Sequence, residues 1–111
     1  MYEAVSTANK SCNVNIQLVD NNGEAAEDVR VTAYLMRSRV VDSAGRIIRN
    51  TLQEVTTDST GVATIPCIWS SYLLPETKWV FKVSDSRIGV FQKPITVPRE
   101  SNYTLTLSDL R

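Results

Sequence analysis

The 111-residue sequence contains no histidine. This absence removes Ser–His and Cys–His nucleophile pairs, imidazole acid–base chemistry and most zinc sites. The four glycines stand at separate positions, so there is no glycine-rich phosphate loop. No motif indicates a Ser–Lys or carboxylate-pair mechanism. We therefore expect a protein that is not an enzyme and has no cofactor, because a small domain without histidine has few ways to tune a pKa to neutrality.

An excess of charge of one sign is also missing, because 12 Lys and Arg residues balance 12 Asp and Glu residues. Such a chain has no bulk attraction for phosphate, so we expect neither nucleic acid nor a membrane as a partner. The apolar runs reach only two to four residues, too short to cross a bilayer. The first fifteen residues contain no charged segment followed by an apolar one, so no secretory signal is expected, and Met1 favours a complete chain.

Cysteine is scarce, with only Cys12 and Cys67 in the sequence. A disulfide framework in a domain this small usually needs more cysteines. A free cysteine often behaves as a small buried apolar residue. The sequence leaves open whether these two cysteines are bonded to each other.

Apolar and polar residues alternate along four stretches, which is the pattern of half-buried strands. The apolar positions are Val14, Ile16 and Leu18; Val29, Val31, Ala33 and Leu35; Trp79, Phe81 and Val83; and Tyr103, Leu105 and Leu107. Further strands are predicted at 51–57 and 62–65. Asp, Asn, Ser and Gly at 20–23, 42–45 and 58–61 favour tight turns between strands.

Prolines mark the least regular segments. Residues 66–76 begin with one proline and contain another, and we expect a loop or short helical turn there, packed on the core through Ile68, Trp69 and Leu73. The extended segment 87–98 also contains two prolines. It is predicted to lie at a sheet edge or to cross between sheets, because proline cannot donate a ladder hydrogen bond.

The whole pattern predicts an all-β protein, a single antiparallel β-sandwich of seven to eight strands. Turn signals recur every 8 to 12 residues, and the sequence has no long helical pattern and no internal repeat. We expect residues 1–12 to form a flexible N-terminal arm and residues 13–111 to form the sandwich domain. A projecting hairpin is predicted where Val40–Val41 and Ile47–Ile48 flank a turn.

Three short motifs follow one another along the chain. A strand ends in Asp-x-x-Gly, a second strand reads Val-x-Val, and Thr-Asp-x-x-Gly-x-Ala follows later; the positions are Asp20, Gly23, Val29, Val31, Thr57, Asp58, Gly61 and Ala63. In these residues the chain resembles carboxypeptidase regulatory-like (prealbumin-like) domains and invasin-type bacterial Ig-like domains, over roughly residues 13–108. The resemblance implies an Ig-like or prealbumin-like sandwich without catalytic activity. The chain departs from that pattern at residues 37–49 and 67–79.

Domains of these families serve as spacers, adhesin segments, or parts of virion tails and capsids. Among these uses we expect a virion structural protein, a bacteriophage capsid-decorating, neck or tail component, because the sequence is one small domain without an export signal or catalytic motif and has a polar arm and an arginine-rich hairpin suited to docking. Its partners would be protein subunits of the particle, and it would form a homo-oligomer located in the virion. The alternatives are a bacterial surface or secreted module, either an adhesin spacer or a carbohydrate binder, and a regulatory domain of a larger enzyme.

Six residues are candidates for an interface: Arg37, Arg39, Arg46, Arg49, Trp69 and Tyr72. The arginines flank the predicted hairpin, where they either form solvated faces that protect its edges or dock on a partner. The two aromatic residues, together with Trp79, either pack in the core or form an exposed patch that binds a protein or a sugar ring.

Two acidic turns carry groups that could bind calcium. Residues 20–28 and 58–61 carry side-chain oxygens, which hard cations prefer. The EF-hand spacing is not met, however, and Asp and Asn favour turns without any ion. We therefore expect no bound metal.

Overall fold

The computed structural model describes residues 10–37, 39–42, 45–48 and 52–111. The described elements are β1 (Ser11–Gln17), β2 (Arg30–Leu35), β3 (Val40–Asp42), β4 (Ile47–Ile48), β5 (Gln53–Thr56), β6 (Val62–Ile68), the 3₁₀ turn η1 (Ser70–Tyr72), β7 (Leu73–Leu74), β8 (Trp79–Asp85), β9 (Gly89–Ile95), β10 (Asn102–Thr106) and the 3₁₀ turn η2 (Leu107–Leu110). The fold is all-β, as the sequence predicts.

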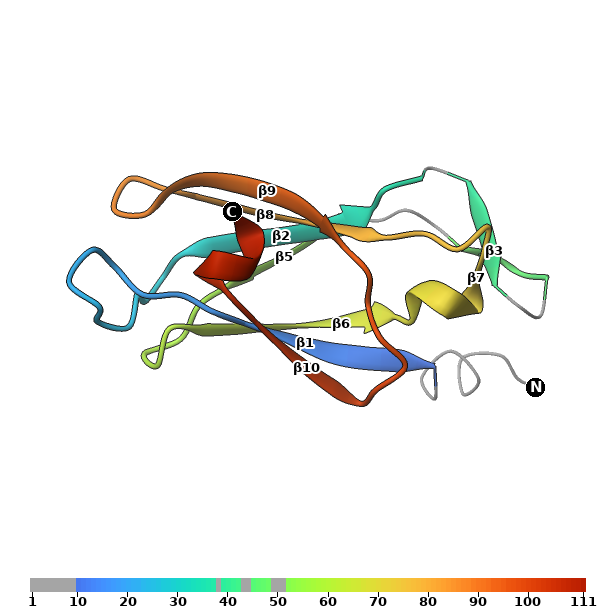
Figure 1. Ribbon diagram of the computed structural model, residues 1–111, viewed down its shortest axis with the longest axis horizontal. Helices are drawn as coiled ribbons and strands as arrows, with labels where there is room; N and C mark the ends of the chain where they lie inside the picture. Colours follow the sequence, from blue (N-terminus) through green and yellow to red (C-terminus); the bar gives the residue numbers. More distant parts are fainter. Residues whose placement is uncertain (1–9, 38, 43–44, 49–51) are drawn as a thin grey trace.

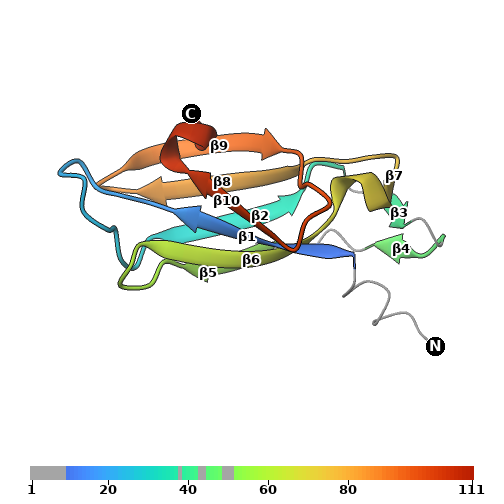
Figure 2. The ribbon, with the colours of Figure 1, turned by 60° about the horizontal axis from the view of Figure 1, so that its bottom comes forward.

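Two sheets form the layers of a β-sandwich (Figures 1 and 2). One has the order β10-β1-β6 and the other the order β5-β2-β8-β9. All neighbours in these sheets are antiparallel except β1 and β10, which are parallel. This pairing differs from the purely antiparallel prediction. It arises because the chain leaves β9 at the edge of one sheet and crosses to the other sheet at the end where β1 begins, where the N–H of Asn13 donates to the carbonyl of Ser101 (2.9 Å).

The core lies between the sheets, on the alternating faces that the sequence indicates. Its members are buried residues of both layers: Val14, Ile16, Leu18, Val29, Val31, Ala33, Leu35, Ala63, Ile65, Trp79, Phe81, Val83 and Leu105. The prediction of these faces is confirmed, except that Tyr103 and Leu107 are only half-buried. Burial of these side chains is the main stabilising term for a sandwich of this size.

The seven longer strands of the sandwich agree with the predicted number, and three short strands were not counted in it. These are β3, β4 and β7, which form a separate small sheet of order β4-β3-β7. The predicted hairpin between Val40–Val41 and Ile47–Ile48 is confirmed as β3 and β4. The turn residues 43–44 lie outside the described residues. The two segments that depart from the family pattern therefore meet, because β7 pairs with β3.

Two predicted boundaries differ from the observed ones. Strand β1 begins at Ser11, and Cys12 is fully buried, so the described part of the predicted arm already belongs to the sheet. The predicted loop at 66–76 starts too early, because β6 continues through Pro66 to Ile68. Proline is tolerated there because β6 is the edge strand of its sheet. Residues 1–9 lie outside the described residues.

The molecule is elongated, with principal extents of 47, 22 and 18 Å. Residues 20–24, 58–61 and 85–89 are gathered at one end, which we call the turn end (Figure 1, left). The small β4-β3-β7 sheet lies at the opposite end, which we call the hairpin end (Figure 1, right). Strand β9, which contains Pro94, is an edge strand, as its prolines predict.

Candidate docking surface at the hairpin end

An ion pair between Asp42 and Arg46 closes the hairpin. The Asp42 side chain is fully buried, and Arg46 places Nε 2.8 Å and Nη2 2.7 Å from its Oδ2. The other oxygen of Asp42 accepts the backbone N–H of Arg46 (2.9 Å). Burial by itself would lower the pKa of Arg46, but its hydrogen bonds to Asp42 and Tyr72 outweigh this and raise the pKa. Arg46 is therefore part of the hairpin's own structure.

Tyr72 joins the same group from η1. The Nη2 atom of Arg46 lies 3.4 Å from the Tyr72 hydroxyl, 26 residues further along the chain. This contact and the β3–β7 pairing connect the hairpin to the segment that follows β6. Arg46 and Tyr72 are thus brought together, as two of the six candidates, in an internal contact.

Arg37 and Arg39 have a different environment. Both are exposed, and neither forms an ion pair with any other residue in the described ranges. Both belong to the link between β2 and β3, which leads from the sandwich into the hairpin. Their charges are available to a partner. Arg49 lies outside the described residues.

A row of apolar side chains crosses the small sheet beside Arg39. Val41 is directly opposite Ile47 on one side and Leu74 on the other, so all three point to the same face. Ile47 is 83% exposed and Leu74 51% exposed, whereas the alternate residues Val40, Asp42 and Leu73 are buried. We call Ile47, Val41 and Leu74 the apolar row. It is the exposed face of a sheet whose other face packs on the core.

The apolar row and Arg39 line a shallow open depression of about 380 Å³, together with Val40. Its lining is mainly apolar, with the guanidinium of Arg39 as the charged group. Such a surface can accept apolar side chains from a partner and can pair with a carboxylate at its rim.

The sequence did not single out the apolar row. Val40 and Val41 are adjacent and equally apolar, so the pattern does not show which of them faces out. Leu74 was hidden in a segment predicted to be a loop. Asp42 points to the wrong face, because an aspartate is usually exposed, and here it is buried through its pairing with Arg46.

Trp69 lies away from the apolar row, where the β1–β6 pairing ends. Its side chain is half-buried, and its indole N–H donates to the carbonyl of Glu100 (3.0 Å). The ammonium of Lys10 lies 5.7 Å from the centre of its ring, and the guanidinium of Arg99 lies 5.3 Å from it. Trp79 belongs to the core, and its indole N–H donates to the carbonyl of Ile68 (2.9 Å).

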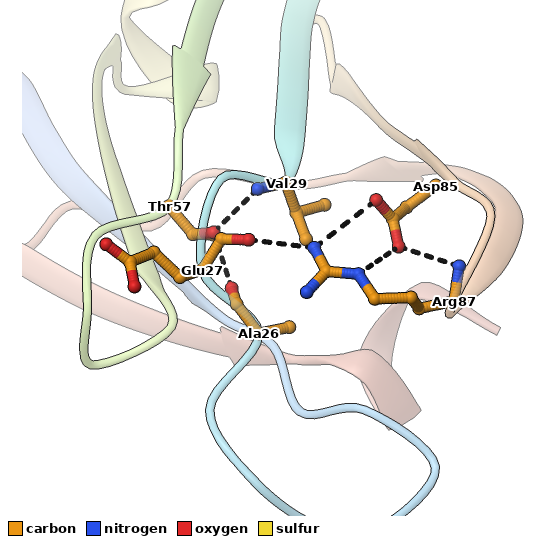
Figure 3. A network of polar contacts seen from close by, with 6 residues as sticks. All are labelled: Ala26, Glu27, Val29, Thr57, Asp85 and Arg87. Carbon is orange, nitrogen blue, oxygen red and sulfur yellow. Dashed lines mark hydrogen bonds and ion pairs between the residues drawn. The ribbon is translucent and has the colours of Figure 1, made fainter.

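At the turn end, the motif residues serve the fold. The buried Thr57 hydroxyl donates to the carbonyl of Ala26 and accepts the backbone N–H of Val29 (2.9 Å), as Figure 3 shows. Beside it, Arg87 donates to the carbonyl of Glu27 (2.8 Å) and pairs with Asp85 (Figure 3). These bonds connect the link between β1 and β2 to the segment that follows β5 and to the turn between β8 and β9.

The acidic turn residues have local partners as well. One oxygen of Asp58 accepts the Thr60 hydroxyl (2.6 Å) and the backbone N–H groups of Thr60 (2.9 Å) and Val62 (3.2 Å), and these bonds lower the pKa of Asp58. Gly61, at φ +79°, packs so closely that a β-carbon would lie 2.5 Å from the carbonyl oxygen of Leu18. The Asp-x-x-Gly motif is therefore explained by turn geometry.

The described residues contain neither a metal-binding cluster nor a membrane-spanning helix. No group of three or more His, Cys, Asp or Glu residues there is arranged to hold a metal ion. None of the helical segments described is long and apolar enough to span a membrane.

Comparison with known proteins finds no family model that matches the chain and no curated protein that matches it significantly. The resemblance to prealbumin-like and invasin-type domains therefore stays a prediction from the motif residues. Function has to be inferred from the surface of this molecule.

Proposed function

We propose that this chain is a non-enzymatic structural protein of a virus particle, a bacteriophage capsid-decorating, neck or tail component. It docks through the hairpin end on a neighbouring protein subunit of the particle. The virion assignment rests on the resemblance to modules used in such particles. The docking assignment rests on the apolar row.

The exposed face of the small sheet is the observation that carries the proposal. A sheet face of this kind costs free energy in water, because Ile47 and Leu74 expose apolar surface on either side of Val41. A local reason for keeping both residues is missing, since the hairpin is already held by the buried Asp42–Arg46 pair. Burial against a partner supplies the reason.

The charges beside the row indicate the chemistry of the partner. Arg37 and Arg39 are exposed cations that form no ion pair among the described residues, although Glu76 lines a surface depression together with Arg37. A partner that offers an apolar strip flanked by carboxylates would bury the row and pair with both cations. Direct self-association through the same face would instead bring the arginines of two copies together, so the partner surface differs from this one. Homo-oligomers would form by each copy docking on a repeated particle subunit.

Co-sedimentation with particles from the same source tests this proposal. Ile47→Asp places a charge in the row at a position that is 83% exposed, so folding should be unaffected while binding is lost. Arg39→Glu should also weaken binding. Val90→Asp is the matched control, because Val90 is an apolar residue that is 67% exposed on β9, outside the row. Light scattering of each variant checks its state in solution.

The outcomes separate the two parts of the proposal. Binding by the wild type and by Val90→Asp, but not by Ile47→Asp, supports both. If Ile47→Asp binds as well as the wild type, the docking surface is assigned wrongly. If the wild type is a monomer that binds no particle, the virion assignment is wrong.

A carbohydrate-binding role is the second candidate, and one observation favours it. The outer face of the four-stranded sheet has an open depression of about 400 Å³, lined by Arg30, Thr32, Tyr34, Leu52, Glu54, Lys82 and Ser84. The hydroxyl of Tyr34 accepts a hydrogen bond from Gln92 (3.2 Å), and Tyr34 is the aromatic residue of this lining. An aromatic ring among hydrogen-bonding groups suits a sugar. Saturable glycan binding by a chain that ignores all particles would favour this role.

A further inference from the structure

The two cysteines lie directly opposite each other on neighbouring strands. Cys12 of β1 is the register partner of Cys67 of β6 in the antiparallel pair. Residues in such positions point to the same face, and both side chains are buried in the core, with exposures of 0% and 1%. Residues 55 positions apart in the sequence are thus adjacent in space, and both carry thiols in this structure.

The ladder fixes the spacing of this pair. The backbone N–H of Trp69 donates to the carbonyl of Lys10, and that of Leu18 to the carbonyl of Gly61, so pairs at even-numbered positions of β1 belong to the hydrogen-bonded class. In that class the two Cα atoms are about 5.5 Å apart, within the range of roughly 4.4–6.8 Å that a disulfide spans. The Cβ atoms of facing residues are about 4.5–5.5 Å apart, wider than the roughly 3.8 Å of a disulfide, so closing the bond draws the strands slightly together.

The pair lies near the end of the ladder, where local opening is easiest. Within the described residues, only two register positions separate it from the outermost backbone bond of the ladder, between Trp69 and Lys10. In the closed state the Cys67 thiol donates to the carbonyl of Ile65 (3.6 Å). Burial raises the pKa of both thiols, and the nearby Glu100 charge adds to this for Cys12, so attack requires opening of this end.

We propose that Cys12 and Cys67 form a reversible redox pair that closes into a cross-strand disulfide. The oxidant is a low-molecular-weight disulfide. One protein thiolate attacks a sulfur of the oxidant, which breaks the oxidant's S–S bond, forms a mixed disulfide and releases one thiol. The second protein thiolate then attacks the protein sulfur of the mixed disulfide and releases the second thiol. Two protein thiols are oxidised, one small disulfide is reduced, and the two protons leave on the released thiols.

The bond would fasten β1, the central strand of its sheet, to the edge strand β6. Oxidation should therefore raise the melting temperature, by about 10 °C or more for a link between residues so far apart in sequence. Any strain from drawing the strands together would reduce this gain and make the bond easier to reduce, so the size of the rise reports how well the disulfide fits the ladder. This inference is independent of the proposed docking function.

The experiment treats reduced wild-type protein with excess oxidised glutathione at pH 8.5 and follows mass and free thiols. We expect a monomer that is about 2 Da lighter, has no free thiol, melts at a higher temperature, and returns to the starting state with dithiothreitol. Cys12→Ala and Cys67→Ala are the matched controls, and each should reach only a single glutathione adduct. Two thiols that stay free, wild-type protein that stops at glutathione adducts, or disulfide-linked dimers would each overturn the proposal.

Discussion

The two ends of the sandwich differ in how far their side chains find partners within the chain. At the turn end, Thr57 and Arg87 form hydrogen bonds with backbone groups of a neighbouring segment, and Asp58 accepts them within its own turn. The polar side chains there thus find their partners inside the chain. At the hairpin end, the buried face of the small sheet is equally complete, but its outer face exposes the apolar row beside Arg39. The motif residues that suggest a family therefore stabilise the fold. Residues outside the motif form the exposed surface that we propose as the docking site.

The arginines in and beside the hairpin therefore have two different roles. Arg46 is committed to Asp42 and Tyr72, while Arg39 lies at the rim of the exposed depression. A charge reversal at both arginines would change folding and docking together. Single changes keep the two roles apart.

The largest expected effect comes from removing the buried carboxylate at the hairpin end. Asp42→Ala leaves the backbone N–H and guanidinium of Arg46 without their acceptor in a buried site, so we expect the free energy of unfolding to fall by roughly 3 kcal/mol. Arg39→Ala should change it by less than about 0.5 kcal/mol, because the side chain is exposed. Urea unfolding followed by tryptophan fluorescence measures both.

Particle binding provides the control for this pair. Arg39→Ala should weaken co-sedimentation although its stability is unchanged. Equal loss of stability in the two variants would show that Arg39 is also a structural residue, and the contrast within the hairpin would disappear.

A smaller effect is expected at the turn end from Thr57→Val. The substitution keeps the shape but leaves the backbone N–H of Val29 and the carbonyl of Ala26 without their side-chain partner. We expect a loss of about 2 kcal/mol in the free energy of unfolding. Thr56→Val on the exposed side of β5 is the matched control and should be nearly neutral. A neutral Thr57→Val would mean that water replaces the hydroxyl and that the link is not held by this residue.

Much of the fold could be predicted from the sequence because period-two alternation reports directly which side of a strand is buried. The core faces of β1 and β2 follow it without exception, β8 follows it except that Val80 on the opposite face is also buried, and the prolines correctly indicate the edge strand β9. The parallel pairing of β1 with β10 could not be predicted, since alternation is the same for both directions of a strand. Pro66 misled the boundary of β6, because proline excludes a central strand but not an edge strand.

The candidate site was predicted only in part, for a physical reason. Composition identifies arginines and aromatics that can bind, but it does not show which of them are already bound within the chain. Arg46 and Tyr72 meet across 26 residues through the β3–β7 pairing, which no local pattern predicts. The same pairing places Leu74 beside Val41 and creates the row. Thr57 was recognised as a motif residue, but its role in holding Ala26 and Val29 depends on the fold.

The smallest expected effect is a pH dependence at the turn end. Asp58 has a lowered pKa because its carboxylate accepts bonds from the Thr60 hydroxyl and from backbone N–H groups of Val62 and Thr60. A lowered folded-state pKa stabilises the protein fully above the unfolded value of about 3.9, and this contribution is lost as the pH falls through the folded value. The stability advantage of the wild type over Asp58→Asn should therefore be constant from pH 7 to about pH 5 and shrink below about pH 4. Urea midpoints measured between pH 2 and pH 7 give this difference directly.

An advantage that persists unchanged at pH 2 would show that the turn depends on the shape of residue 58 and not on its charge. The contrast between locally satisfied and partner-dependent charges would then rest on the hairpin end alone.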